Sequence, residues 1–470
     1  MSGAPNPLRV AIIGAGPAAF YAADHILKQS ATAEVDMFDR LPTPFGLVRH
    51  GVAPDHQKIK SVVKGFAAVA TSPRFRFYGN VEFGRDIDLD GLARHYHQVL
   101  FATGAQTDRR MNIPGEDLAG SYPATEFVAW YNGHPAYRDE VFDLQTPAAV
   151  VVGVGNVAID VARMLSLEEH ELAATDMARH AVAALARSQV RDVHVLGRRG
   201  PTQAAFTTPE LKELSELPNV DLVIDPAEAA LDALSAAELE RANDPVLRRK
   251  VELIQSLAAR PPAGRPRRLH LRFLVSPEEL IDDGHGRVAA VRLARNELVG
   301  SETGSLSAKP TGATETIAAG IVFRSVGYRG VPLPGVPFDT RWGVVANVAG
   351  RVCSPGTHDL VPGLYTAGWI KRGPSGVIGT NKADAVETVH AMLADAEAGV
   401  TLRPAQPTAA AADDYIRRCC TRPVSFADWQ RLDALEVEAG VRAGCPRVKF
   451  ASVASMLAAL AGGEGGPAGN

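Results

Sequence analysis

The sequence has few cysteines and few aromatic residues, and neither sign of charge dominates it. Only four of its 470 residues are cysteine, and none of them forms a CxxC pair or an iron–sulfur spacing. A dithiol relay or an internal iron–sulfur cluster is therefore not indicated. We expect the adjacent pair Cys419-Cys420 to be packed residues of a C-terminal helix rather than a redox pair. The formal net charge of -4 is too small to indicate nucleic acid or a membrane surface as a partner.

Long apolar runs and a leader segment are also missing. The longest apolar stretch, at 148–165, carries Asn156, Asp160 and Arg163, and no signal peptide precedes the first expected strand near Leu8. We therefore expect a globular α/β protein of the cytoplasm. A hydrophobic content of 46% over this length is enough for two or three buried cores.

The sequence contains a pair of glycine-rich turns. They are Gly14-Ala15-Gly16-Pro17-Ala18-Ala19 and Gly153-Val154-Gly155-Asn156-Val157-Ala158. Each turn follows a short apolar run and leads into an alanine-rich helical stretch, which is the strand, turn and helix order of a dinucleotide-binding motif. The first glycine permits the tight turn, and the second lets the backbone approach a pyrophosphate at the positive end of the helix. Two such motifs in this context predict two dinucleotide sites.

The residues that end the strand after each turn carry opposite charge. After the first turn, the apolar strand at 35–38 ends at Asp39, an acid placed to accept hydrogen bonds from ribose hydroxyls. After the second turn, the strand at 193–196 leads into Arg198 and Arg199, whose guanidiniums suit a 2′-phosphate. Taken alone, the two arginines could equally be a solvated strand end, but the motif upstream favours the phosphate interpretation. The contrast predicts two different nucleotides, with NADP at the second site.

The order of the expected strands predicts two nested Rossmann-like domains. A buried strand at 99–105 would close the first nucleotide-binding domain, and one at 320–327 would close the second. After Gly330 the sequence resumes the character of the first domain. We expect a discontinuous first domain at 1–105 and 330–402, a second at 106–329, and a linker with a helical C-terminal tail at 403–470.

Three longer segments are more specific than the two turns. They are LPTPFGLVRHGVAPDH at 41–56, GRRGPTQAAFTTPE at 197–210 and GWIKRGPSGVIGTNK at 368–382. With these segments the chain resembles, from Leu8 to about His390, the adrenodoxin-reductase-like family of ferredoxin–NADP reductases. The resemblance implies FAD in the first domain and NADP(H) in the second. It also implies transfer of hydride from NADPH to flavin N5, followed by single-electron transfers to a ferredoxin-type iron–sulfur protein.

The resemblance implies a set of FAD contacts. The first turn would face the pyrophosphate, and Asp39, where the family commonly has Glu, would hold the ribose. Other positions would pack against the flavin ring or contact it through the backbone. The full set is Gly14, Ala15, Gly16, Pro17, Ala18, Asp39, Leu47, Val81, Trp369, Gly376, Val377 and Ile378.

A second implied set concerns NADP(H). The second turn would face its pyrophosphate, the arginine pair its 2′-phosphate, and one acid would make a polar contact. These residues are Gly155, Asn156, Val157, Ala158, Arg198, Arg199 and Glu210. The resemblance also places His56 and Glu213 in a proton and hydrogen-bond network near the nicotinamide, to which we add Asp160 as a candidate. A structural role for His56 and Glu213 is an equally good interpretation, because hydride transfer itself needs no general base.

A basic segment is the candidate docking site for an acidic ferredoxin. Residues 248–272 contain eight Lys or Arg and one acid, Glu252. Within this segment Arg248, Arg249 and Lys250 match a basic stretch that the family uses for its iron–sulfur partner. A solvated helix face is the usual explanation of such a run, and the resemblance favours docking.

Two other functions remain compatible with the sequence. The chain could be the flavin module of a larger oxidoreductase, although the cysteine clusters usual in such modules are absent. It could also be an NADPH-binding flavoprotein that acts as a redox-sensitive switch. Turnover discriminates the switch from a reductase, because a switch would form a long-lived reduced flavin and pass electrons slowly to every acceptor.

Overall fold

The computed structural model describes residues 7–300, 305–462 and 467. The chain divides into two compact units. Unit 1 comprises Met1–Thr107, Asn132–Ala136 and Gly327–Asn470, and unit 2 comprises Asp108–Tyr131 and Tyr137–Val326. Unit 2 is therefore inserted in the chain of unit 1, and the C-terminal helices belong to unit 1. Among the described residues, no helix is long and apolar enough to cross a membrane.

Unit 1 is built on a mostly parallel sheet. Its central strands are apolar and buried on both faces; β1, for example, reads RVAII and is buried along its whole length. β1, β2, β3, β4 and β20 run parallel, and β19 and β18 continue one edge in antiparallel pairing. In spatial order the strands are β18 (Asn347–Val348), β19 (Arg351–Cys353), β20 (Leu360–Thr366), β4 (Gln98–Phe101), β1 (Arg9–Ile13), β2 (Glu34–Phe38) and β3 (Phe75–Tyr78).

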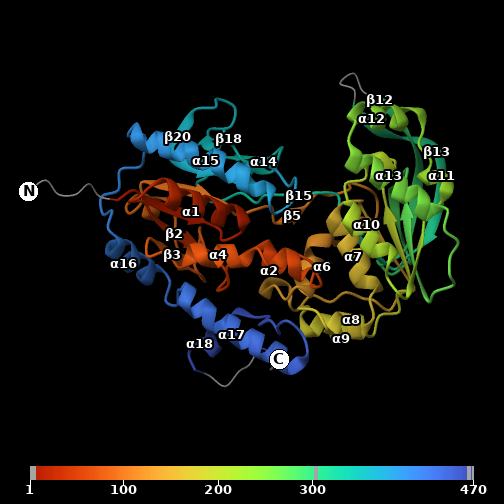
Figure 1. Cartoon of the computed structure of the whole chain (residues 1–470), viewed down its shortest axis with the longest axis horizontal. Coiled ribbons are helices and arrows are strands. Elements are labelled where there is room, and N and C mark those ends of the chain that lie inside the picture. The colour runs from red at the N-terminus through yellow and green to blue at the C-terminus, as the bar shows by residue number, and fades with distance from the viewer. Residues whose placement is uncertain (1–6, 301–304, 463–466, 468–470) are drawn as a thin grey trace, which may run out of the picture. The chain divides into compact units, whose positions relative to one another are not determined.

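Helices cover this sheet. α1 begins at Pro17 directly after the first glycine-rich turn, and its alanine-rich face packs against α15, far away in the sequence (Figure 1). The helices of unit 1 that precede its C-terminal segment are α1 (Pro17–Gln29), α2 (Leu47–His50), α3 (Gln57–Lys60), α4 (Val63–Ala70), α5 (Leu89–Ala93), α14 (Trp369–Arg372) and α15 (Thr380–Glu397). Short strands complete the unit: β5 (Thr107–Asp108) starts in it, and β15 (Tyr328–Arg329), β16 (Phe338–Asp339) and β17 (Val344–Val345) lie within it.

The C-terminal segment folds as α16 (Ala409–Cys419), α17 (Phe426–Ala443) and α18 (Val453–Leu460), coloured blue in Figure 1. The helical tail expected from the sequence is confirmed. Ser425 begins α17 with a capping box, because its hydroxyl accepts from the Asp428 amide while the Asp428 carboxylate accepts from the Ser425 amide. Apolar residues of α17 and α18 share one buried core with the first dinucleotide turn: Phe426, Trp429, Leu432 and Met456.

The cysteine pair lies at the end of α16. Cys419 is exposed, Cys420 is buried, and both are free thiols. The Cys420 thiol donates to the carbonyl of Asn80 at 3.2 Å, and burial raises its pKa. A raised pKa disfavours the reactive thiolate, which agrees with a packing role for Cys420.

Unit 2 has a parallel sheet of its own. The strand order is β6 (Ser121–Pro123), β14 (Ile321–Arg324), β7 (Ala148–Val152), β8 (Asp192–Leu196), β10 (Arg267–Arg272) and β9 (Val220–Val223). Its helices are α6 (Ala124–Tyr131), α7 (Asn156–Ser166), α8 (Glu169–Ala173), α9 (Arg179–Leu185), α10 (Thr208–Ser215), α11 (Pro226–Ala229), α12 (Ala233–Ala242) and α13 (Pro245–Ala258). An antiparallel sheet of β11 (Val275–Asp282), β12 (Val288–Gly300) and β13 (Leu306–Ala318) packs beside it. The expected fold class, two nested Rossmann-like domains with C-terminal helices, is confirmed.

Candidate cofactor sites

The first glycine-rich turn lies where β1 ends and α1 begins. Gly14 has a φ of 102°, and a Cβ there would lie 2.6 Å from the Ala102 carbonyl oxygen, so only glycine fits. At Gly16 a Cβ would meet nothing within 4 Å, which leaves open space in front of the helix. No side chain caps α1. The first turn of the helix therefore presents backbone N–H groups to that space, which suits a pyrophosphate.

Asp39 ends β2 beside this turn. Its carboxylate accepts hydrogen bonds from the backbone amides of Ala15 at 3.0 Å and Leu41 at 2.9 Å. Burial raises the pKa of Asp39 to about 6, although the two amides act in the opposite direction. A carboxylate has acceptor sites beyond these two bonds, so ribose hydroxyls could donate to it as well.

A strained turn connects the dinucleotide turn to α2. Phe45 and Gly46 both have positive φ, 82° and 48°. The Phe45 amide donates to the Ala15 carbonyl at 2.8 Å, and a Cβ at Gly46 would lie 3.0 Å from the Gly16 Cα. Leu47, at the start of α2, is 45% exposed. The turn thus holds an apolar side chain beside the space in front of α1.

Val81 lies deeper in unit 1. Its side chain is buried, and its amide donates to the Asp39 carbonyl at 2.9 Å. It supports the end of β2, and only its backbone could reach a ligand there.

The segment after β20 approaches α1 from the other side. Gly368 has a φ of 79°, and a Cβ there would lie 2.7 Å from the Cβ of Ala18. Trp369 follows, stacked on Tyr328 with 5.8 Å between ring centroids, and its indole N–H donates to the Ser375 carbonyl at 3.2 Å. The structure therefore holds Gly368 beside α1 and fixes the Trp369 side chain against Tyr328 and the Ser375 carbonyl.

Three further predicted residues follow Trp369 in the same loop. Gly376 has a φ of 76°, and a Cβ there would lie 2.3 Å from the Thr380 hydroxyl oxygen. Val377 is 54% exposed, and Ile378 packs against the core of unit 1. Like Leu47, Val377 therefore offers an exposed apolar side chain on unit 1.

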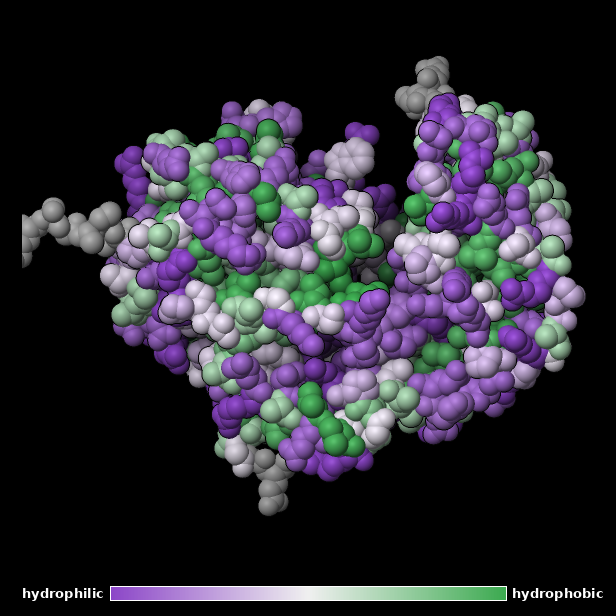
Figure 2. Space-filling model, viewed as in Figure 1, coloured by the Kyte–Doolittle hydropathy of each residue, from purple (hydrophilic) through white to green (hydrophobic). Residues whose placement is uncertain are grey.

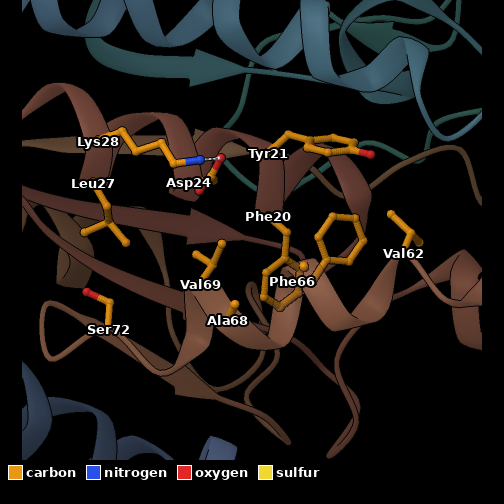
Figure 3. Close-up of a pocket in the computed structure, with 11 residues that line it drawn as sticks. Phe20, Tyr21, Asp24, Leu27, Lys28, Val62, Phe66, Ala68, Val69 and Ser72 are labelled. Carbon is orange, nitrogen blue, oxygen red and sulfur yellow. Dashed lines mark hydrogen bonds and ion pairs between the residues drawn. The ribbon is translucent and has the colours of Figure 1, made fainter.

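A surface hollow of unit 1 lies elsewhere on α1. It has a volume of about 480 Å³ between α1 and α4 and is lined mainly by apolar side chains, among them Phe20, Tyr21 and Phe66 (Figure 3). Its charged residues Asp24 and Lys28 pair with each other at 2.7 Å. Figure 2 shows hydrophobic side chains on this part of the unit. None of the predicted site residues is among the described residues that line the hollow, so it is not the predicted FAD site.

The second glycine-rich turn repeats the first in unit 2. Gly153 has a φ of 127°, and a Cβ there would lie 2.2 Å from the Ser325 carbonyl oxygen. Gly155 directly precedes α7. Among the described residues, a Cβ there would meet nothing within 4 Å, and no side chain caps the helix. The Asn156 side chain is not free to point into the space in front of α7, because its oxygen accepts from the Thr207 amide at 2.9 Å. Val157 is half-buried and Ala158 fully buried, so both contribute packing and backbone.

Arg198 and Arg199 follow β8 at the same edge of this sheet. Arg198 is exposed and Arg199 half-buried. Within the part of the chain that the structure describes, neither guanidinium has a hydrogen bond or ion pair. Burial and the neighbouring charge of Arg198 lower the pKa of Arg199. The charge of Glu238 acts in the opposite direction on Arg199. The two guanidiniums keep donors that a phosphate could accept from.

The predicted acids of unit 2 converge on a residue that sequence reasoning missed. The Arg163 guanidinium of α7, 2% exposed, donates to Asp160 at 2.7 Å and to Glu210 at 3.2 Å, and it lies 3.6 Å from Glu213. A buried arginine with hydrogen bonds to such acids fixes their positions. The signal was present, since Arg163 interrupts an apolar stretch three residues after Asp160. His56 belongs to unit 1, where it precedes α3 with a side chain that is 10% exposed.

The basic segment differs from the expectation. Lys250 is buried, and its ammonium donates to the Ala204 carbonyl while lying over the Phe206 ring. The prediction that Lys250 offers a charge for docking is therefore wrong. Lys250 lies on the face of α13 that packs against the core of unit 2. Arg248 pairs with Glu240 at 3.0 Å, and Arg249 is exposed.

Other basic residues of the segment are also used internally. Arg268 pairs with Asp192 at 2.7 Å, and Arg272 with Glu228 at 2.7 Å. Arg267 donates to the carbonyls of Leu165 and Leu167. The number of basic residues in this segment thus overestimates the positive charge that a partner would meet.

Comparison with known proteins gives the family. The family model for pyridine nucleotide-disulphide oxidoreductases matches residues 8–199. The NADPH-ferredoxin reductase FprA of Mycobacterium tuberculosis (strain ATCC 25618 / H37Rv) is 46% identical over 96% of this chain and 99% of the relative. The mitochondrial NADPH:adrenodoxin oxidoreductase of Bos taurus is 41% identical over 96% of this chain and 92% of the relative. This chain belongs to the adrenodoxin-reductase-like family of ferredoxin–NADP reductases.

A solved structure agrees with this membership of the adrenodoxin-reductase-like family. The structure titled as Mycobacterium tuberculosis FprA in complex with NADPH has a TM-score of 0.90 to this chain, at 46% identity, with 96% of this chain and 99% of that chain covered. The span that the family model matches contains both glycine-rich turns and extends to Arg199. Both predicted cofactor sites therefore involve residues within the matched span.

Proposed function

We propose that this chain is an FAD-dependent ferredoxin–NADP(+) reductase that oxidises NADPH and reduces a ferredoxin-type iron–sulfur protein. The observation that carries the proposal is the contrast between the two dinucleotide turns. One has the Asp39 carboxylate beside it, and the other has the two unpaired guanidiniums of Arg198 and Arg199. An acid suits an unphosphorylated ribose and an arginine pair suits a 2′-phosphate, so the two sites favour different nucleotides.

Unit 1 is the proposed FAD unit. The open backbone at Gly16 and the uncapped start of α1 would hold the pyrophosphate, and Asp39 would hold the ribose. Leu47 and Val377 would pack against the ring system and exclude water from it. When bound, the flavin accepts hydride from NADPH and releases electrons one at a time to the iron–sulfur acceptor.

Unit 2 is the proposed NADPH unit. Arg198 and Arg199 would bind the 2′-phosphate, and the start of α7 would bind the pyrophosphate. Asn156 helps to form this site by holding the Thr207 amide. Lys250 acts on the same loop, because it binds the Ala204 carbonyl. Its proposed role is thus to shape the NADPH site.

Three residues remain candidates for the hydrogen-bond network near the nicotinamide. Arg163 would orient Asp160 and Glu213 through its guanidinium. His56, which precedes α3 in unit 1, is the third candidate. The same Arg163 fixes Glu210, the proposed polar contact to the nucleotide.

For the acceptor, Arg249 is the best remaining docking residue. It is exposed and has no hydrogen-bond or ion-pair partner within the described ranges of the chain. Arg248 could assist by leaving Glu240, since both side chains are largely solvated. An acidic iron–sulfur protein would be attracted to such charges.

The proposed location is the cytoplasm. The four cysteines are all free thiols, as expected in a reducing compartment. Cell fractionation followed by detection of the protein tests this point.

Stopped-flow kinetics test the proposed function. The purified flavoprotein is mixed with NADPH or NADH while flavin bleaching is recorded, and oxidised ferredoxin is then added. The proposal expects faster bleaching by NADPH and rapid reoxidation by ferredoxin. A long-lived reduced flavin that passes electrons slowly to every acceptor would instead support the redox switch.

A further inference from the structure

The C-terminal helices reach the α2 segment through a fully buried ion pair. Glu436, in the middle of α17, is 0% exposed and accepts two hydrogen bonds from the Arg49 guanidinium, at 2.8 Å and 2.5 Å. Arg49 belongs to α2, nearly four hundred residues earlier in the chain, and its guanidinium also lies over the Trp429 ring at 5.0 Å. A bidentate pair of this kind fixes both partners in one geometry.

The remaining bonds of this contact come from the segment between α17 and α18. The Phe450 amide donates to the Glu436 carboxylate at 2.9 Å, and Arg447 donates to it at 3.2 Å. The buried ammonium of Lys449 donates to the Arg49 carbonyl at 3.2 Å. The Glu436 carboxylate thus accepts four hydrogen bonds. Burial alone would raise the pKa of Glu436, but the charges of Arg49 and Arg447 and the bond from the Phe450 amide lower it.

This contact lies directly behind the first dinucleotide turn. Arg49 is four residues after Phe45, whose amide binds the Ala15 carbonyl. The Phe45 ring itself meets the Trp429 ring edge-on at 6.0 Å between centroids. The tail therefore contacts both the strained turn and the helix that follows it. Because Phe45 and Gly46 adopt left-handed backbone conformations, packing around them must supply the energy that holds them there.

We propose that Glu436, on α17, is a positioning residue for FAD that acts through its ion pair with Arg49. Glu436 holds Arg49, Arg49 holds α2, and α2 holds the Gly46 turn against Gly16 and Leu47 beside the open space. Glu436 itself would touch neither cofactor nor substrate. This inference rests on the proposed function, in that it takes unit 1 as the FAD unit.

The test compares FAD binding by three full-length variants with that of the wild type. E436Q keeps the size of the side chain and removes its charge. E438Q is the matched control, because Glu438 lies on the same helix with a side chain that is 64% exposed. L432A is the control for stability, because Leu432 is a buried core residue of α17 without polar contacts. Each apoprotein is titrated with FAD while flavin fluorescence is followed, and Tm and the visible flavin spectrum are recorded.

We expect the dissociation constant of FAD to rise at least about tenfold in E436Q, with a shifted flavin absorption band. E438Q should behave as the wild type. L432A should lose at least as much Tm as E436Q and keep its FAD affinity within about twofold, because it leaves the ion pair intact. Should E436Q fail to fold, R49K takes its place, since lysine keeps the charge and loses the bidentate geometry and the stacking.

Wild-type affinity and spectrum in E436Q, or an equal loss of affinity in L432A, would overturn the inference. Failure of the wild-type apoprotein to bind FAD would instead overturn the proposed function. The two failures are therefore distinguishable in one set of titrations.

Discussion

At the scale of single residues, the proposed choice of nucleotide rests on three charged positions. Asp39 has two backbone amides as partners, whereas neither Arg198 nor Arg199 has a hydrogen bond or ion pair within the residues that the structure describes. The Asp39 carboxylate keeps acceptor sites for ribose hydroxyls, and the two guanidiniums keep donors for a phosphate. Hydrogen bonds between arginine and phosphate are charge-assisted and stronger than neutral ones, so the arginine pair should contribute most to the discrimination.

Neutralising the arginine pair should change the choice of cofactor. In R198Q/R199Q we expect NADPH to lose about 3 kcal/mol of binding, roughly 100-fold in KM, while NADH use changes little. The reason is that only NADPH carries the 2′-phosphate. Steady-state kinetics with both cofactors measure the effect, and R241Q, at an exposed position of α12, is the control. Equal losses with NADPH and NADH would contradict the 2′-phosphate assignment.

FAD affinity should depend on pH through Asp39. Burial raises the pKa of this carboxyl from 3.8 to about 6 in the protein without ligand. Ribose hydroxyls need the ionised form as acceptor, so the dissociation constant of FAD should increase as pH falls from 7 to 5, at most about tenfold per unit. The sign for stability is opposite. Between the two pKa values the folded apoprotein binds the proton more tightly than the unfolded chain, so this group stabilises it at low pH and the contribution is lost as pH rises through about 6.

Titration of the apoprotein with FAD between pH 5 and 8 measures this dependence. D39N is the control, because an amide of the same size cannot titrate. The interpretation would be wrong if D39N retained the pH dependence of the wild type.

At the scale of elements, each site is a strand, a glycine turn and a helix start, and the two glycines of each turn have different tasks. Gly14 and Gly153 are required by the fold, because a Cβ would overlap a backbone carbonyl. Gly16 and Gly155 have ordinary negative φ, −85° and −98°, and open space in front of them. The fold itself would accept a Cβ there, so the proposed reason for these two glycines is the approach of the ligand.

Alanine substitutions should separate these tasks. G14A should destabilise the apoprotein by about 2 kcal/mol or more, because it combines positive φ with a steric overlap. G16A should leave the Tm of the apoprotein unchanged or slightly higher and weaken FAD binding at least about tenfold, because the methyl group enters the phosphate space. Thermal melts and FAD titrations distinguish the two variants. A G16A protein with unchanged FAD affinity would show that the open space at Gly16 is not the phosphate site.

The elements around the turns could be predicted because their signals are local. The strands expected at 99–105 and 320–327 form as Gln98–Phe101 and Ile321–Arg324, shorter because glycine and polar residues end the apolar runs. The partners of Arg49, Lys250 and Arg163 could not be predicted in the same way. Glu436 lies far from Arg49 in the sequence, and the direction of Lys250 follows from which face of α13 meets the core. The identity of a charged residue does not tell whether its side chain reaches the surface or pairs with a buried partner.

At the scale of the whole molecule, the question is how a chain with net charge -4 attracts an acidic partner. Of the basic residues at 248–272, several neutralise acids or carbonyls within unit 2. Recognition must then depend on a few exposed charges. This makes the docking proposal sharper than the sequence alone allowed, since neighbouring residues of one helix have different expected effects.

Arg249 and Lys250 are the pair that tests it. R249Q should raise the KM for ferredoxin about threefold to tenfold at low salt and reduce its dependence on ionic strength, with NADPH-driven flavin reduction unchanged, because an exposed charge acts through steering and docking. K250M should do the reverse. The methionine side chain still packs beside the Phe206 ring, but it cannot donate to the Ala204 carbonyl. Flavin reduction by NADPH should therefore slow, while the salt dependence of ferredoxin reduction stays as in the wild type. Stopped-flow reduction by NADPH and steady-state ferredoxin reduction at several salt concentrations measure both effects. If K250M and R249Q changed the ferredoxin reaction equally, the buried ammonium would be acting at long range on the partner, and a docking role confined to exposed charges would be refuted.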